Sequence, residues 1–549
     1  MAMDPTPQNA LDQHQSLLFR LPRELRDEIY YYYSQANGYY YDSTSGTLRM
    51  DGGECIDLSL QYTCKRTAAE MQGIALGINT MTFRTMLDLP RPSDQLMKSQ
   101  IFGYYIDEGR GAILSRMLEW TYPLVTAETM RKLCERHPAN LAVKKMRELH
   151  REGDSDGPLA RGHLWGELED VDTVDYNEFS AQTFEIIRDL LDIISTEPEF
   201  WHMTASDFDV NARRAFFVAT NHWATRWEAF EDYLMKHVPV YTSKAEQQRV
   251  LQWRPDSWSI PTNDDLEAVA EFLPHDDDSD PFDMVHIRGG RRSYFSAAAV
   301  AIQFLSRLSE SARSHLRQVT ILEDEQSDPE SSSHARGLLP FCISNTQLKI
   351  ERRVDIWRTS LIRTSRATHD AGTQLIMKEI GMWISETKAL FVLGTLPGSY
   401  NLVLHGPSPL ASQQICDATV RVAIWEEGCT SIAKVDTFQG HYFVHFLGEG
   451  FVEAIKGVVE GSIPARFDAD MGKIWDIDQL MKEKDGDWPS DLEDVFEIRN
   501  LEQPPEGWCA AHEERFGVWE HRDYIEVDWT EYMEGVDMLF KQNEVNESD

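Results

Sequence analysis

Apolar residues recur at helical spacing in several stretches of the chain. Between Phe179 and Ile194 they return every three or four positions, which predicts a helix with one apolar face. A second stretch has the same periodicity and is rich in aromatic residues: Phe216, Trp223, Trp227, Phe230 and Leu234. Large side chains at this spacing are typical of a helix that faces the core, so we interpret the stripe as core rather than as a ligand site.

A third helix is predicted from Ser296 to Leu316, where small residues at the start allow close packing against a neighbour. It leads into a segment in which Val319 and Ile321 alternate with polar residues, as in a half-buried strand. The expected surface connections are acidic stretches with Gly or Ser: Gly153 to Asp175, His275 to Asp283, and Glu323 to Ser333.

The C-terminal third changes character, because short β-rich runs alternate with a helical pattern. Two such runs, Ala389 to Gly394 and Tyr400 to His405, are separated by the turn signal Thr-Leu-Pro-Gly-Ser. A helix is expected around Gln413 to Glu426, and a strand from His441 to Leu447. We predict a mixed α+β structure there. Repeats of fixed period are absent from the sequence, which argues against a solenoid.

The N-terminal pattern predicts a short amphipathic helix after Pro22, which is expected in the first helical turn. Leu25, Ile29, Tyr32 and Tyr33 share one face, which Leu21 extends outward, and half of the tyrosine run is expected to belong to the core. The charged block from Arg23 to Glu28 fills the other side and is expected to be solvated.

Three further elements are expected before residue 90. The run from Tyr39 to Met50 contains a Ser-Gly bend between β-prone flanks and predicts a hairpin. A second helical segment spans Lys65 to Leu76, and a strand follows from Asn79 to Thr85.

Composition narrows the class of protein. Of 549 residues, 91 are acidic and 53 are Lys or Arg, and the net charge of −38 opposes attraction to nucleic acid or anionic lipid. The densest basic clusters are two pairs, Arg291–Arg292 and Arg352–Arg353, too small for a nucleic-acid footprint. Seven scattered cysteines with no CxxC pair indicate buried thiols in a reducing compartment. Without a signal peptide or a membrane-spanning run, we expect a cytoplasmic or nuclear protein.

Motifs that carry chemistry are missing. The sequence has no Walker loop, GxGxxG, HExxH or GxSxG, so we expect no cofactor, no metal and no catalytic residue. His441 and His445 are placed on a strand, where four residues span about 13 Å, too far apart for one metal ion. Ser331 to Ser333 are expected in a solvated loop, where a kinase could reach them beside Arg336, although an unregulated loop is favoured.

Three N-terminal segments together resemble a known domain. They are Leu-Pro-x-Glu-Leu-Arg-x-x-Ile-Tyr from Leu21, Leu-x-x-Thr-Cys-Lys-Arg-x-x-x-Glu from Leu60, and Asn-Thr-x-Thr-Phe from Asn79. This combination resembles the F-box-like N-terminus of many fungal proteins. F-box proteins dock on a Skp-type adaptor and recruit a substrate to a cullin-based ubiquitin ligase. The resemblance implies a set of partner-binding residues: Leu21, Pro22, Leu25, Ile29, Leu60, Cys64 and Lys65.

The predicted fold class is α+β and predominantly helical. Residues 15–90 form an F-box-like segment with a hairpin insertion, 91–345 a mainly helical region, and 346–549 an α+β region with an acidic tail. The leading hypothesis is a non-enzymatic interaction protein that binds a Skp-type adaptor and an unknown protein substrate.

Two alternatives remain open. The chain is a scaffold whose Leu-Pro helix packs into its own core, or it is an unrecognised hydrolase. An exposed apolar patch at Leu21, Leu25 and Ile29 would favour adaptor binding over the scaffold. The hydrolase would need several polar side chains to converge in a pocket: His334, His405, Cys342, Asp355 and Glu351.

Overall fold

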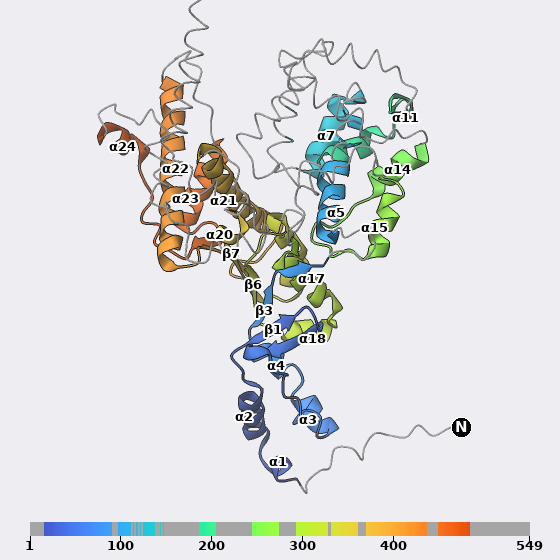
Figure 1. Ribbon diagram of the computed structural model, residues 1–549, viewed down its shortest axis with the longest axis vertical. Coiled ribbons are helices and arrows are strands. Elements are labelled where there is room, and N and C mark those ends of the chain that lie inside the picture. The colour runs from blue at the N-terminus through green and yellow to red at the C-terminus, as the bar shows by residue number, and fades with distance from the viewer. Residues whose placement is uncertain are drawn as a thin grey trace, which may run out of the picture. The chain divides into compact units, whose positions relative to one another are not determined.

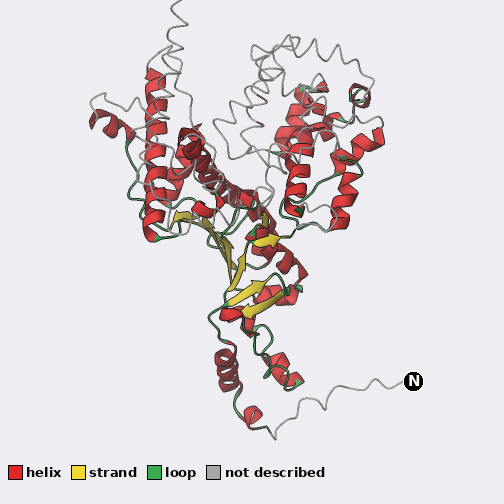
Figure 2. Ribbon diagram, in the orientation of Figure 1, coloured by secondary structure: helices red, strands yellow, loops and turns green. Residues whose placement is uncertain are grey.

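The computed structural model describes residues 16–89, 97–110, 113–114, 117–118, 121, 124–137, 143, 147, 186–204, 244–273, 293–327, 331–360, 369–435 and 448–483. Figure 1 labels the elements, and Figure 2 shows that helices predominate over strands. The predicted class, α+β and predominantly helical, is confirmed.

A seven-stranded mixed sheet draws strands from all three predicted regions of the chain. Its strands are β1 (Tyr39–Asp42), β2 (Thr47–Met50), β3 (Met81–Arg84), β6 (Gln318–Glu323), β7 (Lys349–Asp355), β8 (Tyr400–His405) and β9 (Ala465–Phe467). Their order is β2-β1-β3-β6-β7-β8-β9. Only β1 and β2 pair antiparallel, as the predicted hairpin, and all other pairs are parallel. Two further strands, β4 (Met86–Asp88) and β5 (Ser293–Phe295), form a separate antiparallel pair.

From β1 onward, each strand of the sheet lies beside the sheet strand that comes before it in the chain, apart from the β1–β2 hairpin. Stacked repeats have the same order, but here the connections between strands differ greatly in length. The sequential strand order therefore arises here without a fixed period in the sequence.

Alternate strand residues separate a buried face of the sheet from a more exposed one. Ile321, Arg352 and Leu402 lie in one register row and are all buried. The neighbouring residues Glu351 and Arg353 are partly exposed. Helices pack close to these strands: α17 (Ala297–Arg307), α20 (Ile356–Thr359), α21 (His369–Val392), α22 (Pro409–Val435) and α23 (Gly448–Glu460).

The core of the sheet encloses one complete ion pair. Arg352 donates to Glu323 from Nε at 2.9 Å and from Nη2 at 2.5 Å, and both side chains are 0% exposed. Glu323 also accepts the backbone N–H of Ala297 at 2.8 Å, at the start of α17. The Arg352 guanidinium lies 4.4 Å from the centre of the Trp383 ring and donates to the Ser331 carbonyl. A buried charge needs such partners, because isolated burial would cost several kcal/mol.

The other helical segments have the following bounds. Those before the middle of the chain are α1 (Leu17–Arg20), α2 (Arg23–Ser34), η2 (Asp51–Gly53), α3 (Lys65–Glu70), α4 (Ile74–Ile78), α5 (Lys98–Tyr104), η3 (Tyr105–Arg110), α7 (Ala127–Arg136) and α11 (Phe200–Met203). Those after it are α14 (Lys244–Gln252), α15 (Asn263–Ala270), α18 (Glu310–His315), η5 (Ser331–Leu338), α19 (Leu339–Ser344) and α24 (Ile477–Glu483). Residues 186–194 are helical too, inside the helix predicted to end at Ile194.

Two predicted helices are each divided in two. The segment from Ser296 to Leu316 breaks at Leu308, because Ser309 accepts the N–H of Ala312 and starts α18. The segment from Lys65 breaks at Gly73, whose φ of 77° is open to glycine but strained for other residues. A Cβ atom at Gly73 would lie 2.2 Å from the His315 ring, so this glycine also permits close packing between α4 and α18.

The strand predicted from Ala389 to Gly394 is wrong. Residues 389–392 form the end of α21. The helix ends shortly before Gly394, whose φ is 103°. A short apolar run has no periodicity that separates a strand from a buried helix, and here the preceding helix extends through it. In contrast, β6, β8 and α22 confirm the strands and helix expected near Val319, Tyr400 and Gln413.

One predicted surface connection is also wrong. The stretch from Glu323 to Ser333 was expected to be a solvated connection, but Glu323 is buried and Ser332 and Ser333 are nearly inaccessible in η5. Arg352, one member of the basic pair with Arg353, is fully buried as well. Polar composition misled the interpretation of the 323–333 stretch because its polar groups form hydrogen bonds and ion pairs with other elements.

Several predicted features lie outside the described residues. They are the aromatic stripe from Phe216 to Leu234, the connections at 153–175 and 275–283, the Arg291–Arg292 pair, and the strand from His441 to Leu447.

Candidate partner-binding surface

Helix α2 buries its polar side. Its buried residues are Arg26, Tyr30 and Ser34, spaced four apart on one face. The prediction that the charged block is solvated is therefore wrong for Arg26. Its partner is Glu70, 44 residues further along the chain, which no local pattern could indicate.

Glu70 at the end of α3 joins α2 to α3. It accepts two bonds from Arg26, each of 2.8 Å, one from the Tyr30 hydroxyl at 2.9 Å, and one from Arg66 at 3.0 Å. The Arg26 hydrogen bonds are the main reason why the pKa of Glu70 falls to about 2. Two guanidinium groups and a phenol thus fix one carboxylate, and α2 is held against α3 by polar contacts.

The apolar side of α2 faces outward. Leu25 is 46% exposed and Ile29, one turn later, is 39% exposed, while Tyr32 is more exposed still. The prediction that half of the tyrosine run belongs to the core is wrong for Tyr32, while Leu25 and Ile29, whose burial the sequence left open, are exposed. Tyr33 is half-buried and Leu21 is half-buried at the start of the helix.

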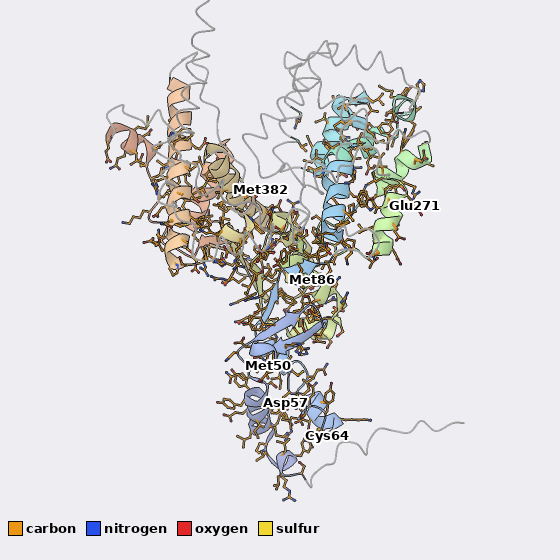
Figure 3. The ribbon with its side chains drawn as sticks, in the orientation of Figure 1. Met50, Asp57, Cys64, Met86, Glu271 and Met382 are labelled. Carbon is orange, nitrogen blue, oxygen red and sulfur yellow. The ribbon has the colours of Figure 1, made fainter. Side chains whose placement is uncertain are left out.

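The loop before α3 borders this apolar side. The Tyr33 hydroxyl accepts the backbone N–H of Leu60 at 3.1 Å and also bonds with Asp57. Leu58 and Tyr62 in the same loop are exposed. Figure 3 labels Asp57 and Cys64 in this segment. We call the exposed side chains here the apolar surface: Leu25, Ile29, Tyr32, Leu58 and Tyr62.

The two groups of predicted partner-binding residues are held together in this segment. Arg26 near the start of α2 meets Glu70 at the end of α3, and Tyr33 near the end of α2 meets the loop before α3. The two helices therefore run antiparallel, so that Leu60 lies beside Tyr33 near the end of α2, whereas Leu25 lies near its start beside Arg26.

Three predicted residues have local roles at helix starts. Pro22 is exposed and precedes the first residue of α2, one position earlier than predicted. The Cys64 sulfur accepts the Thr67 N–H at 3.4 Å and caps α3, and Lys65 is exposed beside it.

The sequence interpretation missed Tyr30 and Glu70 as a bonded pair. Both occur in the motif that resembles an F-box, together with Arg26. The available signal was that Arg26, Tyr30 and Glu70 are chemically complementary, although their separation in the chain hid the pairing.

The five residues of the hydrolase alternative are placed at several different positions around the sheet. Asp355 and His405 are register partners on β7 and β8, and burial raises the pKa of Asp355. His334 lies with Arg352 on the buried face, whereas Glu351 is on the opposite face. Burial raises the pKa of Cys342 to about 11. Two hollows, of about 520 and 780 Å³, are lined by none of the five.

Comparison of the chain with known protein families, curated proteins and solved structures finds no match. Within the described ranges, no three His, Cys, Asp or Glu side chains are grouped so that they could hold a metal ion. None of the helices in that same part of the chain is long and apolar enough to cross a membrane.

Proposed function

We propose that the chain is an F-box-like interaction protein whose apolar surface docks on a Skp-type adaptor. The observation that carries this proposal is the outward orientation of Leu25 and Ile29 over a helix pair locked from behind by Glu70. Fully burying a Leu or Ile side chain contributes about 1.5–3 kcal/mol, so two such residues are a substantial part of a docking energy.

The hydrogen bonds from Arg26 and Tyr30 to Glu70 support the proposal because they hold α2 against α3. The apolar side chains of α2 are not needed for this packing. A helix that packed into its own core would bury Leu25 and Ile29 and leave Arg26 in solvent. In the structure Arg26 is buried, whereas Leu25 and Ile29 are exposed and can contact a partner. We therefore favour adaptor docking over the scaffold alternative.

In this proposal the larger, acidic part of the chain binds a protein substrate for a cullin-based ubiquitin ligase. The chain itself performs no chemistry. Its contribution is to hold the adaptor and the substrate at fixed positions on one polypeptide.

The test is binding of the full chain to a purified Skp-type adaptor by isothermal titration calorimetry. The double variant Leu25→Ser/Ile29→Ser removes the apolar side chains and keeps the Glu70 contacts. We expect binding by the wild type and at least a tenfold loss in the variant, equivalent to about 1.4 kcal/mol.

Ile343→Ser/Leu410→Ser is the matched control, since these residues are 53% and 69% exposed and lie outside the apolar surface. It should bind as the wild type does. Absence of binding by the folded wild type, or equal binding by both double variants, would overturn the proposal.

A further inference from the structure

A bend between the N-terminal helix pair and the sheet has the sequence Asn37-Gly38. It lies in the short connection from the end of α2 at Ser34 to the start of β1 at Tyr39. Asn37 is exposed, whereas Gly38 is buried. Asn37 is also the one asparagine of the chain that is followed by glycine. An exposed side-chain amide beside a backbone nitrogen without a neighbouring side chain is the arrangement in which an asparagine can react with its own chain.

The backbone requires glycine at position 38. The φ of Gly38 is 109°, a conformation that strains residues with a side chain. A Cβ atom here would lie 3.2 Å from the Thr80 carbonyl oxygen, which already accepts the Tyr39 N–H at 2.8 Å. The fold therefore keeps a glycine after Asn37, and the backbone nitrogen of that glycine is not shielded by a Cβ atom.

The two reacting groups are not engaged elsewhere in the part of the chain that the structure describes. Within that part, neither the Asn37 amide nor the Gly38 N–H forms a hydrogen bond. Other asparagines are in different surroundings. The side chain of Asn79 makes three hydrogen bonds inside the fold, and Asn263 is exposed but is the first residue of helix α15. A hydrogen-bonded amide or a helical backbone hinders the attack that the bend at Asn37 permits.

We propose that Asn37 and Gly38 form a site of self-modification. The Gly38 backbone nitrogen attacks Cγ of Asn37, loses its proton and closes a cyclic imide, while the side-chain nitrogen leaves as ammonia. Because both groups belong to one short segment, the attack is intramolecular and has a high effective concentration. Water then opens the imide at either of its carbonyls. One product has aspartate at position 37, and the other has isoaspartate, whose backbone continues through the former side chain.

This modification alters the joint between α2 and the sheet. On one side of Asn37 the Ala36 N–H donates to the Asn79 side chain at 2.8 Å, and on the other side the Tyr39 N–H donates to the Thr80 carbonyl. Isoaspartate inserts one more backbone carbon between these two hydrogen bonds, and both products add a negative charge. We expect one of the two bonds to break, which loosens the attachment of the helix pair to β1. The site is separate from the apolar surface and does not depend on adaptor docking.

The test follows the purified full chain during prolonged incubation in warm, mildly alkaline buffer, which promotes removal of the Gly38 proton. Trypsin releases residues 27–49 as one peptide, in which Asn37 is the only asparagine. Mass spectrometry measures the loss of the amide, and methylation by an isoaspartate methyltransferase measures the isoaspartate. Isoaspartate is diagnostic of the imide, because direct hydrolysis of the side-chain amide yields aspartate alone.

Asn263 is the internal control, since it is also exposed but is followed by Asp264 in a helix. We expect about tenfold more conversion at Asn37 than at Asn263, because glycine leaves the attacking nitrogen unhindered. The isoaspartate should be found in the peptide that contains Asn37.

Asn37→Ser removes the reactive amide and keeps a small polar residue that suits a bend. In the incubated wild type, hydrogen exchange at Ala36 and Tyr39 should become several-fold faster than in the fresh protein. The incubated Asn37→Ser variant should keep the protection that it has when fresh.

Absence of isoaspartate from the 27–49 peptide, or equal conversion at Asn37 and Asn263, would overturn the proposed site. Isoaspartate without any change in hydrogen exchange would show that the joint tolerates the modification, and the expected loosening would be wrong. Equal loss of protection in the incubated wild type and the incubated Asn37→Ser variant would also contradict it, because the change would then arise elsewhere.

Discussion

Two regions of this protein each bury a Glu–Arg pair, and they differ in what surrounds it. In the sheet, Glu323 and Arg352 lie among buried apolar residues and both are fully inaccessible. In the N-terminal helix pair, Arg26 and Glu70 are nearly buried, but the apolar side chains of the same helix point outward.

The comparison shows that a buried ion pair can serve two purposes. Between β6 and β7 it links the sheet to the start of α17 within a complete core. Between α2 and α3 it replaces the apolar packing that a helix of this pattern would ordinarily use. Helix α2 is therefore held through its polar side only, and its apolar side is exposed to solvent and to a binding partner.

The largest expected effect is on the sheet. Glu323→Gln keeps the shape of the side chain but leaves the Arg352 charge without a counter-ion, so we expect the free energy of unfolding to fall by about 3–5 kcal/mol. Urea unfolding followed by circular dichroism measures it. Glu351→Gln, which loses two partly exposed pairs with Arg353 and Arg466, should cost about 1 kcal/mol or less. Similar losses in both variants would contradict this contrast.

The next effect is on the helix pair. Glu70→Gln weakens the hydrogen bonds from Arg26, Arg66 and Tyr30, and we expect a local loss of about 2–3 kcal/mol. Hydrogen exchange of residues 23–34 should become faster while β6 and β7 keep their protection. Glu24→Gln, an exposed change on α2, is the control. Unchanged exchange in the Glu70 variant would show that these bonds do not hold α2.

Acid should act on the helix pair through the same carboxylate. Because the pKa of Glu70 is lowered from 4.5 to about 2, its contribution is present above the ordinary pKa and is lost as the pH falls toward 2. The hydrogen-exchange protection of residues 23–34 should therefore differ less between the wild type and Glu70→Gln as the pH falls from about 5 to 2. A difference that stays constant over this range would contradict the assignment.

The smallest stability effect is expected on the apolar surface. Leu25→Ala should change the free energy of unfolding by less than about 1 kcal/mol, since the side chain is already 46% exposed. Leu402→Ala, at a fully buried position of β8, should cost about 2–5 kcal/mol in the same urea experiment. A large loss for Leu25→Ala would mean that this residue belongs to the core.

Sequence patterns located many elements because their signals are local. The hairpin at Tyr39–Met50, the alternation around Val319 and the helix near Gln413 depend on neighbouring residues and turn chemistry. The strand predicted from Ala389 failed for the same reason, since a short apolar run has no decisive local signal.

The candidate surface could be predicted only in part. The motif identified Leu25 and Ile29, but their outward orientation depends on Glu70, and the burial of Ser333 depends on Arg352 and η5. Such pairings join residues far apart in the chain. Side-chain orientation and burial at these positions depend on tertiary contacts, and neither the periodicity nor the composition of the sequence predicts those contacts.

The order of the strands also bears on how the protein is made. Strands β6 to β9 can pair one after another as they leave the ribosome, because each joins the one just synthesised. The N-terminal strands β1, β2 and β3 can also pair with one another early, but about 230 residues separate β3 from its second partner, β6. At roughly 5–20 residues per second, β3 waits about 10 to 50 seconds for that partner. During this interval the nascent chain presents an unpaired β3 edge, so we expect a chaperone-dependent stage early in synthesis.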